Sequence, residues 1–142
     1  MIVVDTNVAS ELMRPAPDAR VVTWVRANAG DELYTTSITV AEIRYGLERL
    51  PDGARKALLR ATAVQVFSAF AAHVLAFDAD AAGLYGDIVA ARQRGGAPID
   101  GFDAQIAAIC RRHAATLATR NVKDFAQTGV DIVDPWNEDR AG

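Results

Sequence analysis

Short apolar runs alternate along this chain with segments of helical length, and no other feature limits its possible folds so strongly. The runs cover residues 2–4, 33–36, 74–77, 116–119 and 130–133. Apolar and β-branched runs of this length, bounded by turn residues, are typical of buried strands. Strands separated by helices form βα units, in which neighbouring strands pair in parallel. The sequence therefore predicts an α/β fold with a central, mainly parallel sheet of four to five strands.

Start and stop signals place the helices between these runs. Pro15 ends a first, short helix, because proline cannot continue one. The later helix starts are marked by side chains that can accept a hydrogen bond from a free backbone N–H. These are Asp18, Ser37 or Thr39, Asp78 with Asp80, and the segment 100–103. A long helix is expected over residues 54–72, with an apolar face formed by Leu58, Leu59, Val66, Phe67 and Phe70.

Length and composition are those of one globular domain spanning residues 1–142. Of the 142 residues, 51% are apolar and 23% charged, which is enough for a single buried core. No apolar stretch is long enough to cross a membrane, and no basic segment precedes the first apolar run, so neither an anchor nor a signal peptide is expected. The lone cysteine, Cys110, cannot form an intrachain disulfide, which favours a cytoplasmic setting. Its apolar neighbours in a predicted helix, Ile106 and Ile109, favour a buried structural thiol. The net charge of −3 does not by itself suggest nucleic-acid binding, although it is an average over the whole surface.

Acidic and amide side chains follow three of the expected strands. Asp5 comes directly after the first strand, Glu42 lies just past the second, and Asp124 or Asn121 lies just past the fourth. Parallel strands end at one edge of a sheet, so these groups are expected to converge there. Asp103 opens the helix before the fourth strand, and only the packing of that helix can fix its place. Asp5 has an alternative role as a plain helix-start residue.

A cluster of carboxylates indicates a cation. Crowded carboxylates repel one another, and Mg²⁺ or Mn²⁺ offsets this repulsion because both ions prefer oxygen ligands. A metal held by acids can activate water and neutralise charge on a phosphodiester. The sequence contains no Walker A motif, Gly-rich dinucleotide loop, Cys/His zinc spacing or Gly-x-Ser-x-Gly elbow. The residues alone therefore favour a metal-dependent enzyme of phosphoryl chemistry.

A phosphatase with an acidic pocket, or a response-regulator receiver domain, also places aspartates at strand ends. That class needs a lysine beside the acids, and the chain has only Lys56 and Lys123. Lys123 could reach the sheet edge, but Glu42 and Asp103 would then have no role. This alternative therefore explains fewer residues.

Four segments occur in an order and at spacings that resemble a known family. They are residues 2–7 (IVVDTN), 37–46 (SITVAEIRYG), 102–108 (FDAQIAA) and 118–125 (ATRNVKDF). Together they resemble the PIN-domain ribonucleases, and within them the FitB-like branch of VapC toxins from VapBC toxin–antitoxin pairs. The likeness covers essentially the whole chain, through Pro135-Trp136. It implies a three-layer α/β/α fold with the sheet in the middle.

The resemblance also implies a set of acidic residues. Mg²⁺ or Mn²⁺ would be held mainly by Asp5 and Asp103, with Glu42 completing the catalytic acids. The family's fourth acid falls near Asn121, which carries no charge. Either Asp124 takes its place or the site has three acids.

Three polar side chains match supporting positions of the same site. Thr6 and Thr119 correspond to residues that hydrogen-bond near the carboxylates, and Asn7 lies beside Thr6 in the first motif. We expect these three side chains, with Asn121, to hold Asp5 in place.

The resemblance further implies partners. An endoribonuclease of this family cleaves RNA and slows translation and growth, is inhibited by a VapB-type antitoxin, forms a homodimer, and reaches DNA only through the antitoxin. A second hypothesis is a regulatory binding protein with little catalysis, whose acidic pocket receives an arginine from the antitoxin. RNA cleavage that depends on a divalent metal would distinguish the two.

Overall fold

Five short strands form a parallel sheet in the middle of the molecule, in the order β3-β2-β1-β4-β5. The computed structural model describes residues 1–30 and 32–137. Along the chain the elements are β1 (Ile2–Val4), α1 (Thr6–Leu12), α2 (Ala19–Ala27), β2 (Leu33–Thr36), α3 (Ser37–Glu48), α4 (Ala54–Ser68), β3 (Val74–Leu75), α5 (Ala79–Arg94), α6 (Gly101–Arg112), β4 (Thr116–Ala118), the 3₁₀ helix η1 (Val122–Phe125) and β5 (Ile132–Val133). The predicted α/β class is confirmed.

β1 is the central strand, and the register of its neighbours brings distant parts of the chain together. Val3 lies opposite Tyr34 of β2 on one side and Leu117 of β4 on the other, and both pairings are parallel. From β1 the chain continues outward through β2 to β3, and then returns to the other side of β1 for β4 and β5. Loops therefore diverge at the carboxyl end of β1, which is where ligands gather in open α/β sheets.

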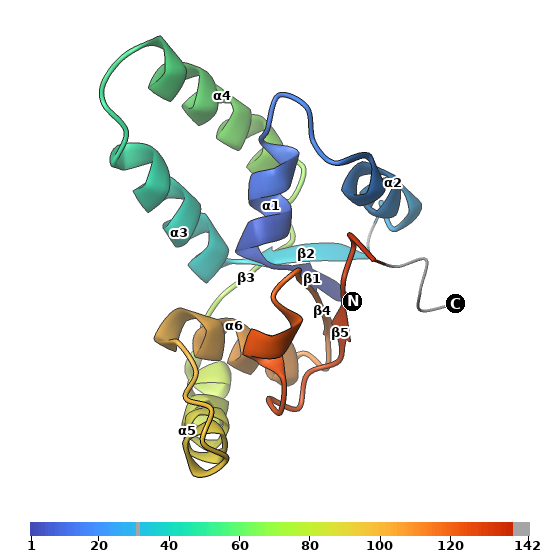
Figure 1. Ribbon diagram of the computed structural model, residues 1–142, viewed down its shortest axis with the longest axis vertical. Helices are drawn as coiled ribbons and strands as arrows, with labels where there is room; N and C mark the ends of the chain where they lie inside the picture. Colours follow the sequence, from blue (N-terminus) through green and yellow to red (C-terminus); the bar gives the residue numbers. More distant parts are fainter. Residues whose placement is uncertain (31, 138–142) are drawn as a thin grey trace.

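Helices cover both faces of the sheet, as the expected three-layer arrangement requires. Neighbouring residues of a strand point to opposite faces. Val3 packs with Ile88 of α5 and Ile106 of α6, whereas Val4 packs with Val8 of α1 and Trp24 of α2. Figure 1 shows α5 and α6 together below the sheet and α1, α2, α3 and α4 above it.

Short polar side chains start most of the helices. Asp18 accepts the backbone N–H of Arg20 at 2.9 Å, and Asp78 accepts that of Ala81 at the same distance, as expected. At α3 the capping residue is Thr36, whose Oγ1 accepts the N–H of Thr39, rather than Ser37 or Thr39. α3 therefore begins with the last residue of β2 as its cap, and Glu42 lies in the second turn of the helix.

The longest expected helix is shorter and less buried than predicted. α4 ends at Ser68, and residues 69–72 form turns. Leu59 and Phe67 pack against α3, but Leu58 is 65% exposed. α4 lies at the border of its layer beside α3 (Figure 1). Its outer face consequently has nothing to pack against in the part of the chain that is described.

The remaining expectations about the core hold. Cys110 is fully buried in α6, and Trp136 closes the core on the α1–α2 face with 3% of its surface exposed.

Within residues 1–30 and 32–137, no helix combines the length and the apolar character that crossing a membrane requires. That residues 1–142 form a single domain stays a prediction.

Candidate active site

Asp5 is fixed at the carboxyl end of β1, where only 3% of it is exposed. Its Oδ1 accepts the backbone N–H of Thr6 at 2.8 Å and so caps α1. Its Oδ2 accepts the Thr119 hydroxyl at 2.8 Å. Burial raises the pKa of this carboxyl, the hydrogen bonds from Thr119 and Thr6 lower it, and the charge of Asp124 raises it. Asp5 is thus both a helix cap and a carboxylate at the strand edge.

Thr119 follows β4 and directs its hydroxyl at Asp5. Its Oγ1 accepts the Asn7 side-chain amide at 3.0 Å and the backbone N–H of Asn121 at 3.0 Å. A hydroxyl has two acceptor positions and one hydrogen, so with both positions filled the hydrogen is left for Asp5 Oδ2. Asn7 Oδ1 in turn accepts the backbone N–H of Arg120 at 3.3 Å. The segment after β4 is thereby tied to the start of α1.

Glu42 reaches the same edge from α3. Its Oε1 accepts the Thr6 hydroxyl at 2.9 Å, and Thr6 Oγ1 lies 3.2 Å from Thr39 Oγ1. Burial raises the pKa of the half-buried Glu42, the Thr6 bond lowers it, and the charges of Asp5 and Asp100 raise it. Thr6 therefore links the two carboxylates through adjacent groups, with its backbone on Asp5 and its hydroxyl on Glu42.

Asp103 completes a group of three acids, and the packing of α6 brings it there. It lies in the first turn of α6, a helix that contacts α3, α5 and β4. Its pKa is raised from 3.8 to about 7, chiefly by burial and then by the charges of Asp5, Asp100, Asp124 and Glu42. Asp103 lines the same hollow as Asp5 and Glu42, so the three acids lie around one space.

The two candidates for a fourth member occupy different places. Asn121 lines the pocket that contains Asp5, and its backbone is bonded to Thr119. Asp124 is exposed on η1 and does not line that pocket, although its charge raises the pKa of Asp5 and Asp103. The charge of Asp124 thus affects the pKa of the acids from outside the hollow, whereas the uncharged Asn121 lies in its wall.

A buried arginine holds the turn on which Asp124 lies. Arg92 of α5 is 6% exposed. It donates from Nη1 to the backbone carbonyls of Asp124 at 2.7 Å and Ala126 at 2.8 Å, and from Nε to that of Ala97 at 2.6 Å. Three backbone acceptors satisfy a buried cation that makes no salt bridge in the described residues. η1 is consequently fixed to α5.

The acids open onto one hollow of about 490 Å³, a size common for ligand clefts. It is lined by Asp5, Thr6, Asn7, Ser10, Glu11, Arg14, Glu42, Asp103, Arg120, Asn121 and Trp136. Five of these lining residues are not among the sequence-based candidates: Ser10, Glu11, Arg14, Arg120 and Trp136. Ser10 and Glu11 lie three and four positions after Asn7 on one face of α1, and Arg14 follows just after the helix at position i+7; this spacing is the signal that could have found them. Arg120 and Trp136 carry no such signal.

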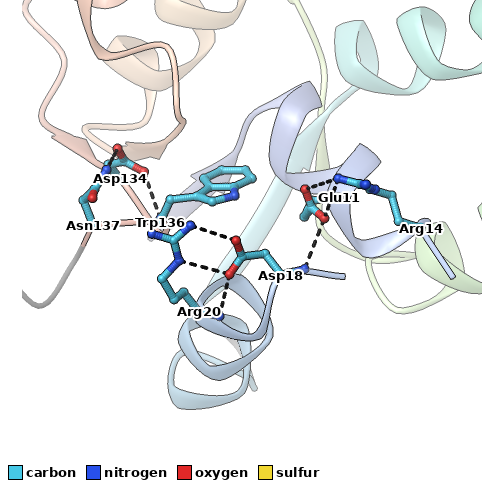
Figure 2. A network of polar contacts seen from close by, with 7 residues as sticks. All are labelled: Glu11, Arg14, Asp18, Arg20, Asp134, Trp136 and Asn137. Carbon is cyan, nitrogen blue, oxygen red and sulfur yellow. Dashed lines mark hydrogen bonds and ion pairs between the residues drawn. The ribbon is translucent and has the colours of Figure 1, made fainter. Parts of the chain in front are cut away.

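Glu11 and Asp18 connect this hollow to the start of α2. The buried Glu11 lies 3.4 Å from Arg14 Nη1 and accepts the backbone N–H of Asp18 at 3.2 Å. Figure 2 shows this network beside Trp136, with Asp18 paired to Arg20. Two carboxylates next to the hollow are therefore already satisfied within the chain.

A family model described as the PIN domain matches residues 2–130. The chain belongs to the PIN-domain family. VapC ribonuclease Y4jK of Sinorhizobium fredii is 41% identical over 137 residues, which are 96% of this chain and 98% of that protein. Toxin FitB of Neisseria gonorrhoeae is 37% identical over 139 residues, which are 97% and 100% of the two chains. The structure of FitAB bound to an IR36 DNA fragment contains a similar chain, with a TM-score of 0.90, 37% identity and 96% coverage of both chains. The recognition of the family from four sequence segments is confirmed.

The donor set of this PIN domain fits a cation held partly by water. In residues 1–30 and 32–137 no three His, Cys, Asp or Glu side chains are placed to enclose one metal ion. Over the same residues, Asp5, Glu42 and Asp103 form no salt bridge with a Lys or Arg side chain. Mg²⁺ commonly binds through one or two carboxylates and keeps several waters. Asp5 and Asp103, two carboxylates that line the same hollow, are the ligand type that this mode of binding uses.

Proposed function

We propose that this PIN domain is the toxin of a type II toxin–antitoxin pair and a metal-dependent endoribonuclease. The observation that carries the proposal is the gathering of Asp5, Glu42 and Asp103 around one open hollow with no paired cation among the described residues. Support comes from the relatives, of which one is called a VapC ribonuclease and another a toxin. RNA as substrate, together with the lone cysteine, favours the cytoplasm as the compartment.

Asp5 and Asp103 are the residues that would hold Mg²⁺ or Mn²⁺. When bound, such an ion polarises a phosphodiester and offsets negative charge on it. Asp5 is kept in one orientation by Thr119 and by the Thr6 backbone. A fixed carboxylate loses little freedom when it takes a ligand, and neighbours of this kind commonly change metal affinity about 10–100-fold.

Glu42 is the residue we assign to orient or deprotonate the attacking water. Burial, together with the charges of Asp5 and Asp100, raises its pKa. A carboxylate whose pKa is raised toward neutral pH is a better base than an ordinary one. The Thr6 hydroxyl occupies Oε1, so Oε2 remains for the water. Asp124 and Asn121 contribute through charge and position rather than as ligands in this scheme.

Partners follow from the same comparisons. The FitAB structure pairs a similar chain with a second protein on DNA, which supports a VapB-type antitoxin as partner and DNA contact through that antitoxin. We propose that the chain also forms a homodimer. A regulatory protein with little catalysis is the second candidate, because acids without a paired cation would equally accept an arginine from an antitoxin.

The test is RNA cleavage by the purified chain, free of antitoxin, with Mg²⁺ or Mn²⁺ and with or without EDTA. We expect cleavage that EDTA abolishes and that Asp5→Asn and Asp103→Asn each reduce by at least about 100-fold, as expected when a charge-stabilising group is lost from an active site. Asn keeps the cap of α1, so the fold should persist. Asp87→Asn, at an exposed position of α5, is the matched control.

Two results would count against the enzyme. No cleavage with any divalent metal would favour the regulatory protein. Wild-type cleavage by either site variant in the presence of Mn²⁺ would show that the site is assigned to the wrong residues.

A further inference from the structure

We propose that Arg120, stacked on Trp136, binds a backbone phosphate of the RNA next to the one that is cut. The inference rests on the proposed ribonuclease function and adds a substrate-binding residue to it. Three observations carry it: the place of Arg120 on the rim of the hollow, the way its guanidinium is held, and the charges around it.

The backbone of Arg120 is locked to the acidic centre. It directly follows Thr119, which donates to Asp5, and its N–H donates to Asn7 Oδ1 at 3.3 Å. Its side chain lines the hollow that contains Asp5 and Asp103. An RNA chain that places its scissile phosphate at the acids would therefore bring an adjacent phosphate close to Arg120.

The guanidinium lies over a fixed aromatic ring. Its central carbon lies 4.2 Å from the centroid of the Trp136 ring, and Trp136 itself is buried. Cation–π stacking uses the face of a guanidinium and leaves its N–H groups in the plane. Those in-plane groups form a fork that matches two phosphate oxygens. The stacking therefore orients Arg120 for an anion before any ligand arrives.

The neighbouring carboxylates are already occupied. Asp18 pairs with Arg20 through two hydrogen bonds of 3.1 and 2.8 Å, and Asp134 accepts from the Trp136 backbone and from Asn137 (Figure 2). Within residues 1–30 and 32–137, Arg120 has no carboxylate within salt-bridge distance. Arg120 thus keeps its charge for an outside ligand.

The negative charge around the hollow gives a reason for a positively charged residue at the position of Arg120. Asp5, Glu42 and Asp103 line the same hollow, so an approaching phosphodiester meets several acidic side chains. A cation at the rim offsets that repulsion for the adjacent phosphate.

The test is binding of a labelled single-stranded RNA oligonucleotide in EDTA, where no metal supports cleavage. We expect Arg120→Gln to weaken binding about tenfold, the loss of one charge-assisted contact. The slope of log K against log[salt] should fall by about 0.7, the value for one phosphate on a single strand. Arg120→Lys should keep the salt slope and lose several-fold in affinity, because it retains the charge but not the fork. In the cleavage assay with metal, KM should rise more than kcat falls.

Arg49→Gln is the matched control. Arg49 is exposed and lies over the Tyr45 ring at 5.6 Å, but it does not line the hollow. Equal losses for Arg49→Gln and Arg120→Gln, or Arg120→Gln binding within twofold of wild type, would overturn the inference. So would the absence of RNA binding by the wild type at low salt, whatever the cleavage assay shows. A wild type that binds RNA through Arg120 yet cuts none with any metal would instead count against the proposed function alone.

Discussion

Replacing Asp103 with asparagine should make this protein more stable and less active at once. The folded-state pKa of Asp103 is about 7, against 3.8 for an ordinary aspartate. The unfolded chain therefore releases this proton first, and the ionised form weakens the folded state increasingly as the pH rises from about 4 to about 7. Above pH 7 the whole cost is present, and below pH 4 it vanishes. Asparagine removes it at every pH.

The size of the gain follows from three contributions. The pKa difference corresponds to about 4 kcal/mol at 1.36 kcal/mol per pKa unit, which is an upper limit. Asp103 is only half-buried, and solvent screening reduces this to about 1–2 kcal/mol. The carboxylate also favours the N-terminus of α6, and losing that interaction subtracts about 0.5 kcal/mol. About 1 kcal/mol remains, or a rise in Tm of about 2–4 °C for a chain of this length.

Thermal unfolding in EDTA between pH 4 and pH 8 measures this directly. We expect Asp103→Asn to melt above wild type at pH 8 and level with it at pH 4, while Asp87→Asn follows wild type throughout. Adding Mg²⁺ should stabilise wild type more than the variant, because a ligand stabilises the state that binds it. A gain that is the same at both pH values, or no gain at pH 8, would refute the raised pKa of Asp103 on which this prediction rests.

Three further changes test other parts of the site. Thr119→Val removes the 2.8 Å hydrogen bond to Asp5 and should raise the Mn²⁺ concentration needed for half-maximal cleavage about 10-fold or more. Thr23→Val, on the exposed side of α2, is the control and should leave that concentration unchanged. Asp124→Asn should reduce RNA cleavage about tenfold and clearly less than Asp103→Asn, since Asp124 does not line the hollow; equal losses would make Asp124 a full member of the acidic set. Arg92→Met removes the donor of three backbone hydrogen bonds and should lower the free energy of unfolding in urea by about 3 kcal/mol, against little change for the exposed Arg94→Met. A loss below about 1 kcal/mol would contradict the anchoring of η1.

Local sequence signals were sufficient for the framework of the fold. The strands were predictable because short β-branched runs stand between clear helix starts, and the capping role of Asp18 and Asp78 depends only on residues two or three positions away. Parallel pairing then placed Asp5 and Glu42 on one edge without any knowledge of packing.

Features that depend on distant neighbours were not predictable in the same way. Leu58 satisfies the helical pattern for burial, yet it is exposed because no other element covers that side of α4. The stacking of Arg120 on Trp136 joins residues from two separate turns, and nothing local to either residue indicates it. Asp103 could be named as a candidate from its motif, but its place depends on how α6 packs against α3 and β4.

The hydrogen bond between Thr119 and Asp5 joins residues 114 positions apart, and this separation has a consequence for the chain during its own synthesis. At roughly 5–20 residues per second, a ribosome needs about 6–23 s to travel from one to the other. Throughout that time β1 has no β4 beside it, and Asp5 is a carboxylate without its hydroxyl donor. The proposed site can thus assemble only after β4 and Thr119 have been synthesised and have left the ribosome.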